Sequence, residues 1–265
     1  MRTLNTCMQC LVENGLPDFS SLRFERIPDD GVIEFICDRG HHTFTIIQEA
    51  KFEILSELAV TALCDGYYRE AVASFASALE RLYEFYIDVV RRARGIEQDV
   101  FDKAWKPLRK SSERQLGAFM ALYLMENNEA FLLLDDKHVG FRNEVIHQGK
   151  IPDRAEAIAY GQAVANCASP LITLINSARY EKVLRELIFD SIWERSQRAR
   201  AIGARHSTQS MVTPFRHNPD SLEINLEAIL DERAKRPDMD QAVKESHALG
   251  KLIDTLKSQV SPGQG

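Results

Sequence analysis

The spacing of apolar residues changes near residue 48 of this 265-residue chain, and this change constrains the fold more than any other feature. Before residue 48, short runs of β-branched and aromatic residues at 32–36 and 43–47 are separated by turn signals such as Arg39-Gly40, which is typical of strands. After it, apolar residues recur three and four positions apart, beginning at Phe52 and Leu55, which is typical of helices. The sequence therefore predicts a mainly α protein, in which a helical bundle follows a small β module.

Helix boundaries in the bundle are predicted from capping and breaking residues. Five helices are expected, and each has at least one such signal: one from about 48 to Asp65-Gly66, one from Tyr68 to Arg94, one from Leu116 to Met125 behind a Ser112–Gln115 capping box, one from about 128 to 148, and one that starts at a capping box of Asp153 and Glu156 and continues past Pro170.

Three segments are expected along the chain: the β module at 1–48, the helical bundle at 49–205, and a linker with a C-terminal helical tail at 206–265. The polar stretch from His206 to Pro219 contains two prolines and is interpreted as the linker. Two short amphipathic stretches follow it, and the residues from 258 onward are expected to be disordered.

Charge and composition exclude several classes of protein. The chain has 33 Lys+Arg against 39 Asp+Glu, a formal charge of -6, so we do not expect it to coat nucleic acid by charge alone. A local basic groove is compatible with this net charge. No apolar run approaches the ~18–20 residues of a membrane span, and the polar N-terminus is unlike a signal peptide. The sequence therefore predicts a cytoplasmic protein with no membrane contact.

Three of the five cysteines lie in the first 40 residues, in a pattern typical of a metal site. Cys7-x2-Cys10 is followed by Cys37-x3-His41. The fourth ligand is either His41 or the next residue, His42. Two such knuckles on a β-hairpin supply the four soft or borderline ligands of tetrahedral zinc. Because four protein ligands leave no position for water, the predicted zinc is structural; the alternative is a degenerate ribbon that has lost its metal. The segment Cys37-Asp38-Arg39-Gly40-His41 resembles the end of a zinc ribbon, which implies His41 as the ligand.

A second candidate site lies at the end of the helix that stops before Gly149. Asn143 and His147 are four residues apart and so share a helix face, and the long side chain of Arg142 can reach the same region. An arginine can clamp phosphate oxygens with its fork of donors, and a histidine can move the protons of a phosphodiester cleavage. The bare Arg-x4-His spacing is common by chance, so the prediction of a site depends on the residues around it.

Those surroundings resemble the hallmark helix end of the HEPN superfamily, whose name stands for higher eukaryotes and prokaryotes nucleotide-binding domains. The resemblance rests on Phe141–Pro152 and on the earlier helix from Gly66 to Glu84, and it extends over about residues 50–200. It implies a compact helical bundle, usually a homodimer. Many members are metal-independent endoribonucleases of toxin–antitoxin and phage-defence systems, which implies RNA as substrate and an antitoxin or defence protein as a possible partner.

The resemblance also implies roles for individual residues. Arg142 would position the phosphate, His147 would handle protons, Asn143 would orient the site, and Glu80 in the facing helix would hold Arg142. The 2′-hydroxyl of RNA would attack the adjacent phosphate and leave a cyclic phosphate.

Three other interpretations remain open from the sequence. The first is that Glu80, Arg142 and His147 form a polar cluster that only caps the helix, in a non-catalytic adaptor that binds nucleic acid or protein. The second is a regulated or neutralised toxin that awaits a trigger. The third concerns the basic run Arg91, Arg92 and Arg94, which either touches RNA backbone or forms a solvated helix end.

Overall fold

The computed structural model describes residues 1–216, 223–235 and 239–260. Of the described residues 64% lie in helices, and small β-sheets lie near a Cys/His cluster, which confirms the prediction of a mainly α protein with a small β region. The chain divides into two compact units. The β unit comprises Met1–Gln48, Phe189–Met211 and Lys235–Gly265, and the bundle unit comprises Glu49–Ile188 and Val212–Ala234.

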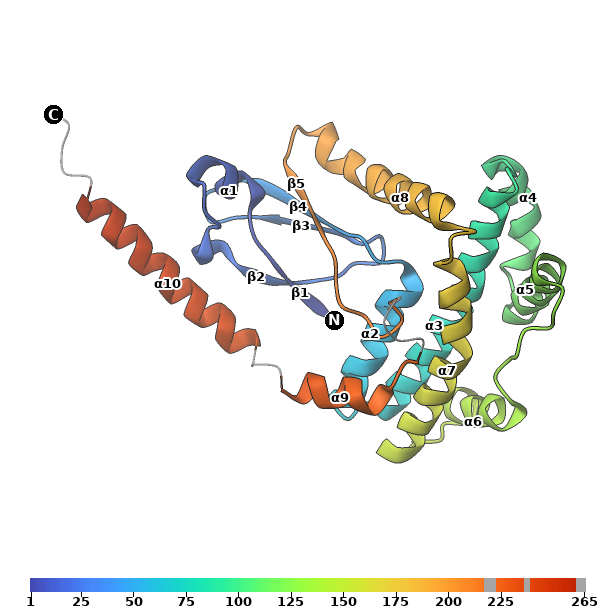
Figure 1. Cartoon of the computed structure of the whole chain (residues 1–265). Coiled ribbons are helices and arrows are strands. Elements are labelled where there is room, and N and C mark those ends of the chain that lie inside the picture. The colour runs from blue at the N-terminus through green and yellow to red at the C-terminus, as the bar shows by residue number, and fades with distance from the viewer. Residues whose placement is uncertain (217–222, 236–238, 261–265) are drawn as a thin grey trace. The chain divides into compact units, whose positions relative to one another are not determined.

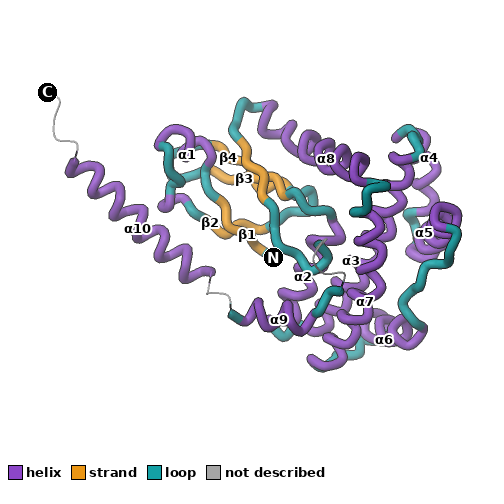
Figure 2. The backbone as a smooth tube through the Cα atoms, in the orientation of Figure 1, coloured by secondary structure: helices purple, strands orange, loops and turns teal. Residues whose placement is uncertain are grey.

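The β unit contains two small sheets, drawn in orange in Figure 2. Strands β1 (Arg2–Asn5) and β2 (Arg23–Arg26) pair antiparallel, and strands β3 (Val32–Ile36), β4 (His42–Ile47) and β5 (His206–Gln209) form the second sheet. The unit also contains helix α1 (Met8–Asn14), a short 3-10 helix η1 (Phe19–Ser21), the second half of α8 (Glu181–Ala201) and helix α10 (Met239–Val260). Its apolar core is small, with Val32, Phe44 and Ala199 at its centre.

Strand β5 corrects the prediction of a linker that begins at His206. The segment pairs parallel with β4, from Phe44 opposite His206 to Ile47 opposite Gln209. The backbone N–H of Gln48 donates to the carbonyl oxygen of Gln209 at 3.0 Å, which extends the pairing by one bond. The strand is stabilised by backbone hydrogen bonds to the edge of β4 and not by apolar side chains. Its residues are polar, so the apolar pattern that predicts a strand is absent from its sequence.

The compact units consequently do not follow the predicted order of three segments. The first segment of the β unit ends at Gln48 and the bundle unit begins at Glu49, close to the expected boundary, but the segments 49–205 and 206–265 are each shared between the units. The predicted disordered end overlaps α10 as far as Val260, and residues 261–265 lie outside the described residues.

The bundle unit consists of helices, coloured from light blue through yellow to orange in Figure 1. They are α2 (Lys51–Cys64), α3 (Tyr68–Ala93), α4 (Gln98–Leu108), α5 (Ser112–Asn127), α6 (Asp136–His147), α7 (Arg154–Ile175), the first half of α8 and α9 (Leu226–Ala234). The long helix α3 packs against α2 on one side and against α5, α6 and α7 on others. Aromatic rings such as Phe75, Tyr83 and Tyr86 on α3 are buried at these contacts, as expected for a core stripe.

Helix α7 is long and apolar enough to cross a membrane, judged by length and composition over the described residues. Half of its most apolar window is buried inside the protein, and it packs against α3. The core helix of a globular bundle meets the same criterion, so the apolar character of α7 is explained by its packing.

Two predicted helix boundaries are confirmed by their caps. Helix α2 ends at Cys64 with Asp65 as its C-cap, and Gly66 follows with a positive φ of 79°, a conformation that glycine adopts readily. The capping box at the start of α7 is complete: the Asp153 carboxylate accepts from the backbone N–H of Glu156 at 2.8 Å, and the Glu156 carboxylate accepts from that of Asp153 at 3.0 Å. The helix continues through Pro170, as predicted.

Two other boundaries differ from the prediction. The cap of α5 is Ser111, whose hydroxyl accepts from the backbone N–H of Arg114, so the predicted Ser112–Gln115 box is wrong by one residue. Helix α6 begins at Asp136 and not near 128, because Asn128 adopts a left-handed conformation that ends α5, and Asp135 then caps α6.

We expect Ser111→Ala to lower the free energy of unfolding by about 1 kcal/mol, because it leaves a helix N–H without its acceptor. Ser112→Ala is the matched control, since Ser112 is the first residue inside the helix, and we expect a change of less than about 0.5 kcal/mol. Urea unfolding of both variants measures the difference. Equal destabilisation by the two changes would contradict the assignment of the cap.

Candidate metal centre and candidate active site

Cys7, Cys10, Cys37 and His41 form a cluster in the β unit that can hold a metal ion such as zinc. Their ligand atoms all lie within 4.8 Å of one another, and the three cysteines are buried. The Cys10 and Cys37 sulfurs are 3.8 Å apart, and His41 Nδ1 lies 3.3 Å from the Cys10 sulfur and 3.8 Å from the Cys7 sulfur. Ligands at zinc bond lengths of about 2.0–2.3 Å around a tetrahedron are separated by about 3.5–3.8 Å, so the donor set fits zinc.

The first pair of ligands is positioned by a helix and not by the predicted β-hairpin knuckle. Cys7 is the N-cap of α1, and its sulfur accepts from the backbone N–H of Cys10 at 3.4 Å. Residues three apart in a first helical turn face the same side, so both sulfurs point toward one centre. The spacing Cys-x2-Cys is shared by helical and hairpin sites, which is why the sequence did not distinguish them.

The second pair lies on the β3–β4 hairpin, as predicted. Cys37 follows β3, and its backbone N–H donates to the carbonyl oxygen of His41 at 3.1 Å. Gly40 has a positive φ of 82°, which a residue with a side chain rarely adopts, and this turn returns the chain toward Cys37.

His41, and not His42, joins the cluster. The side chain of His42 lies 2.6 Å from the Glu34 carboxylate, outside the group of ligands. Successive residues of an extended chain point to opposite faces, so only one of the two histidines can face the sulfurs. The second ring nitrogen of His41 lies 3.5 Å from the Glu13 carboxylate, a typical partner for a histidine that binds metal through its other nitrogen.

The thiols of the cluster have opposed tendencies to ionise. Burial disfavours the Cys7 thiolate, but hydrogen bonds from the Thr43 hydroxyl and the Cys10 N–H outweigh it and lower the Cys7 pKa to about 7. Burial and the neighbouring sulfurs of Cys7 and Cys37 raise the pKa of Cys10. A bound divalent cation stabilises several adjacent thiolates together.

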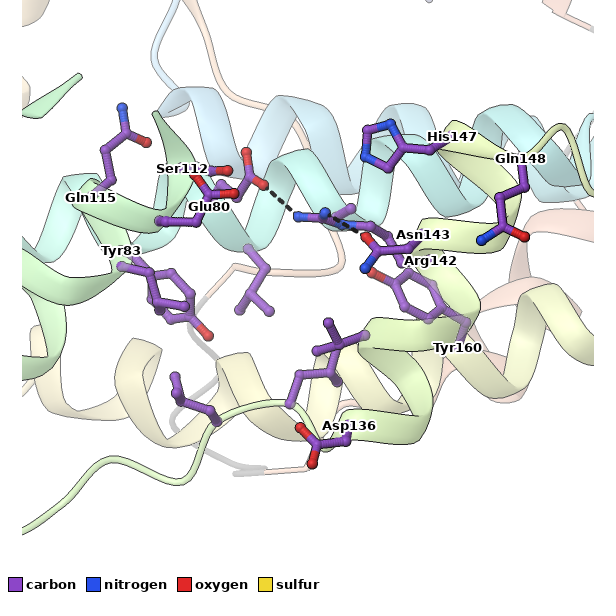
Figure 3. Close-up of a pocket in the computed structure, with 17 residues that line it drawn as sticks. Glu80, Tyr83, Ser112, Gln115, Asp136, Arg142, Asn143, His147, Gln148 and Tyr160 are labelled. Atoms are coloured by element: carbon purple, nitrogen blue, oxygen red, sulfur yellow. Dashed lines mark hydrogen bonds and ion pairs between the residues drawn. The ribbon is translucent and has the colours of Figure 1, made fainter. Parts of the chain in front are cut away.

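The second candidate site is a pocket of 590 Å³ in the bundle unit, formed mainly by α3, α5 and α6 (Figure 3). All four residues predicted for this site line it: Glu80 from α3, and Arg142, Asn143 and His147 from α6. Its other walls are mostly apolar or aromatic, with a few polar groups: Ala76, Leu79, Tyr83, Ser112, Glu113, Gln115, Leu116, Leu133, Leu134, Asp136, Val139, Gln148 and Tyr160.

Arg142 is held at the pocket wall by two hydrogen bonds, drawn as dashed lines in Figure 3. Its Nη2 donates to the Glu80 carboxylate at 2.9 Å, and its Nη1 donates to the Asn143 side-chain oxygen at 3.0 Å. The guanidinium has five N–H donors, so these two bonds fix its plane and leave donor capacity for a ligand. The Glu80–Arg142 contact that the resemblance implied is therefore present.

His147 lies one turn beyond Asn143, in the last turn of α6, and its side chain is exposed at the pocket rim. This exposure leaves the ring accessible to solvent and to a ligand in the pocket. The pocket thus combines a fixed guanidinium, a titratable imidazole and apolar walls.

The basic run at the end of α3 is compensated by acidic side chains. The Arg91 guanidinium donates to Asp88 at 2.6 and 2.7 Å and to the Ile96 carbonyl oxygen at 2.9 Å, and Arg94 donates to Glu126 at 2.8 Å. These arginines therefore join the end of α3 to its surroundings, and because Arg91 is buried, a fully solvated helix end does not describe this run.

Sequence reasoning missed two prominent residues of the pocket, Gln115 and Tyr160. Gln115 is buried and accepts from Arg81 at 3.1 Å through its side-chain oxygen, and Tyr160 is a buried ring whose pKa is raised by burial. Both fit the helical core pattern, so no local signal separates them from ordinary packing residues.

The chain was also compared with known proteins. No family model, curated protein or solved structure matches it.

Proposed function

We propose that the protein is a metal-independent endoribonuclease of the HEPN type, with its active site in the pocket around Arg142 and His147. The observation that carries the proposal is the arrangement of Glu80, Arg142 and Asn143 in one hydrogen-bonded group on the wall of a pocket that His147 also lines. A phosphodiester can be cleaved without a metal when a guanidinium binds the phosphate oxygens and an imidazole transfers the protons. Nucleases of this type serve as toxins and in phage defence, which is the role proposed for this chain.

In the proposed reaction the ribose 2′-oxygen attacks the adjacent phosphorus, and the bond between phosphorus and the 5′-oxygen of the next nucleotide breaks. Arg142 binds the non-bridging oxygens, whose negative charge grows in the transition state. Imidazole takes the proton of the 2′-hydroxyl and imidazolium gives a proton to the leaving oxygen. Asn143 and Glu80 act through Arg142 as positioning residues. The products are a 2′,3′-cyclic phosphate and a 5′-hydroxyl.

The metal cluster is assigned a structural role in this proposal. Zinc bound by Cys7, Cys10, Cys37 and His41 has four protein ligands and no open position for substrate or water. It supplies folding energy to the β unit, and no step of the cleavage uses it.

Cleavage of single-stranded RNA in magnesium-free buffer with a chelator tests the proposal. We expect labelled RNA to be cut and DNA of the same sequence to survive, because DNA lacks the attacking 2′-hydroxyl. Zinc content is measured on the same sample, so that loss of structural zinc is recognised. No cleavage of RNA, or equal cleavage of DNA, would contradict the proposal.

A homodimer completes the proposed site, since one imidazole per chain then gives two at a shared cleft, one as base and one as acid. Three apolar side chains near the pocket helices are strongly exposed: Leu132, Ile151 and Met125, at 87%, 84% and 81%. We propose that these side chains belong to the contact surface between the two copies.

We expect light scattering to give twice the chain mass at micromolar concentration, and Leu132→Asp to shift the protein toward monomer with a parallel loss of cleavage. Leu16→Asp is the control, since Leu16 is 54% exposed but belongs to the β unit. A wild-type monomer that cleaves RNA fully would contradict the dimeric site.

One observation favours a second candidate, a non-catalytic adaptor. Both terminal nitrogens of Arg142 already bond within the protein, to Glu80 and Asn143, as they would in a purely structural cluster. The adaptor predicts RNA binding without cleavage, so the same assay with a binding measurement separates the two.

A further inference from the structure

A second cleft in the bundle unit is lined largely by aromatic side chains. It is a cleft of 260 Å³ between α2, α3 and α4, and four of its eight lining residues are aromatic: Phe52, Phe85, Phe101 and Trp105. The other four are Lys51, Arg81, Glu84 and Asp88. Pockets that enclose a drug-sized ligand have about 300–1,000 Å³, so this cleft has room for one flat ring system rather than for a large molecule.

The rings on α4 are arranged as a stacking surface. Phe101 and Trp105 are four residues apart, with centroids 5.6 Å apart and planes inclined by only 15°. Helix α4 has no buried residue, so both rings stay partly exposed although they pack against the edge of the core. The Arg91 guanidinium lies 5.2 Å from the centre of the Phe101 ring, which leaves Trp105 as the more open of the two. On the opposite wall Phe52 and Phe85 pack against each other at 5.2 Å.

The charges at the cleft favour a neutral ligand over a cation. Arg81 pairs with Glu84 at 2.6 Å, and Arg91 pairs with Asp88 at 2.6 Å. Because each carboxylate of the lining already has a guanidinium partner, an aromatic cage for an ammonium group would lack an available anion. A nucleobase has a flat, uncharged face, and aromatic side chains stack on it.

Arg81 connects this cleft to the pocket of the proposed active site. It lines the cleft, donates to the side-chain oxygen of Gln115 at 3.1 Å, and lies 3.9 Å from the Glu80 carboxylate that holds Arg142. Glu80 and Gln115 line the pocket, so the two hollows are separated by little more than this group of side chains.

We propose that the aromatic cleft is a second subsite for RNA, where an unpaired base of the bound strand stacks on Trp105 and Phe101 while a neighbouring phosphate is held at Arg142. The inference rests on the proposed function for the identity of the ligand. The subsite contributes affinity and no chemistry, and it makes the enzyme selective for single strands, because a paired base cannot enter the cleft.

The two tryptophans of the chain provide the test. Trp193→Phe leaves Trp105 as the reporter in the cleft. Trp105→Phe leaves Trp193, which is 48% exposed on α8 in the β unit and lies beside Phe189, as a matched aromatic control. Both are made in the non-cleaving His147→Ala background and titrated with short single-stranded RNA, with the same oligonucleotide without bases, and with a proline-rich peptide.

We expect RNA to quench Trp105 and to leave Trp193 unchanged, and the oligonucleotide without bases to quench neither. Trp105→Ala should weaken RNA binding about tenfold, the change that about 1.4 kcal/mol produces and within the range of one stacked base. In the active protein it should raise KM and leave kcat unchanged, since stacking is equal in ground and transition states.

Failure of this inference and failure of the proposed function give different results. RNA cleavage with unquenched Trp105, quenching of Trp193 instead, or quenching of Trp105 by the peptide but not by RNA overturns the subsite alone. Quenching of Trp105 by RNA that is never cut supports the subsite and overturns the nuclease.

Discussion

Cys37→Ser is expected to remove the metal and unfold the β unit while the helical bundle stays folded. The apolar core of the β unit is small, whereas structural zinc contributes an apparent ~10–16 kcal/mol in isolated zinc-finger peptides. The bundle unit has its own extensive core of buried side chains, which include Phe75, Leu82 and Tyr86. We therefore expect about one zinc per chain in the wild type and none in the variant, with loss of amide-exchange protection in the β unit and retained protection in the bundle unit.

Cys64→Ser is the matched control for this experiment. Cys64 is an exposed cysteine at the end of α2 in the bundle unit and is not a member of the metal cluster. It should retain zinc and full protection. A Cys37→Ser protein that lacks zinc but keeps the β unit protected would contradict the structural role of the metal.

His147→Ala and Arg142→Ala are expected to abolish measurable RNA cleavage without unfolding the protein. Loss of proton transfer costs typically ~10²–10⁴-fold in rate, and loss of a group that binds the developing charge costs ~10²–10³-fold. His147 is exposed and Arg142 is partly exposed, so neither substitution opens a cavity in the core. Steady-state rates and a thermal unfolding curve for each variant measure both parts of the prediction.

His138→Ala is the control, because His138 lies on the same helix but bonds to Asp135 at 2.7 Å and does not line the pocket. It should cleave RNA at close to the wild-type rate. Equal rates for His147→Ala and His138→Ala would remove His147 from the mechanism.

Features encoded in neighbouring residues could be predicted from the sequence. The Asp153–Glu156 capping box, the end of α2 at Asp65-Gly66 and the metal-binding quartet each depend on residue types at a fixed local spacing. The change of periodicity near residue 48 likewise marked the start of the bundle. Local hydrogen bonds and side-chain periodicity determine these features, so they are visible before any tertiary contact is known.

Features that depend on distant contacts could not be predicted. Strand β5 exists because an edge of β4, more than 150 residues earlier in the chain, offers it backbone partners. Whether Ser111 or Ser112 caps α5 is decided by where the preceding chain turns, and both serines satisfy the composition rule. Gln115, Tyr160 and the aromatic cleft became visible only when helices from separate parts of the chain were packed together.

The central claim is that the 2′-hydroxyl of RNA is the nucleophile and that Arg142 and His147 promote its attack. The most direct test is the chemical nature of the product ends after cleavage of an RNA of defined sequence, together with a copy that carries a single 2′-deoxynucleotide on the 5′ side of the cut. The account predicts a 2′,3′-cyclic phosphate and a 5′-hydroxyl, and no cut at the substituted position. A 5′-phosphate with a 3′-hydroxyl, or an unaffected cut at the deoxy position, would show that water is the nucleophile and would contradict it.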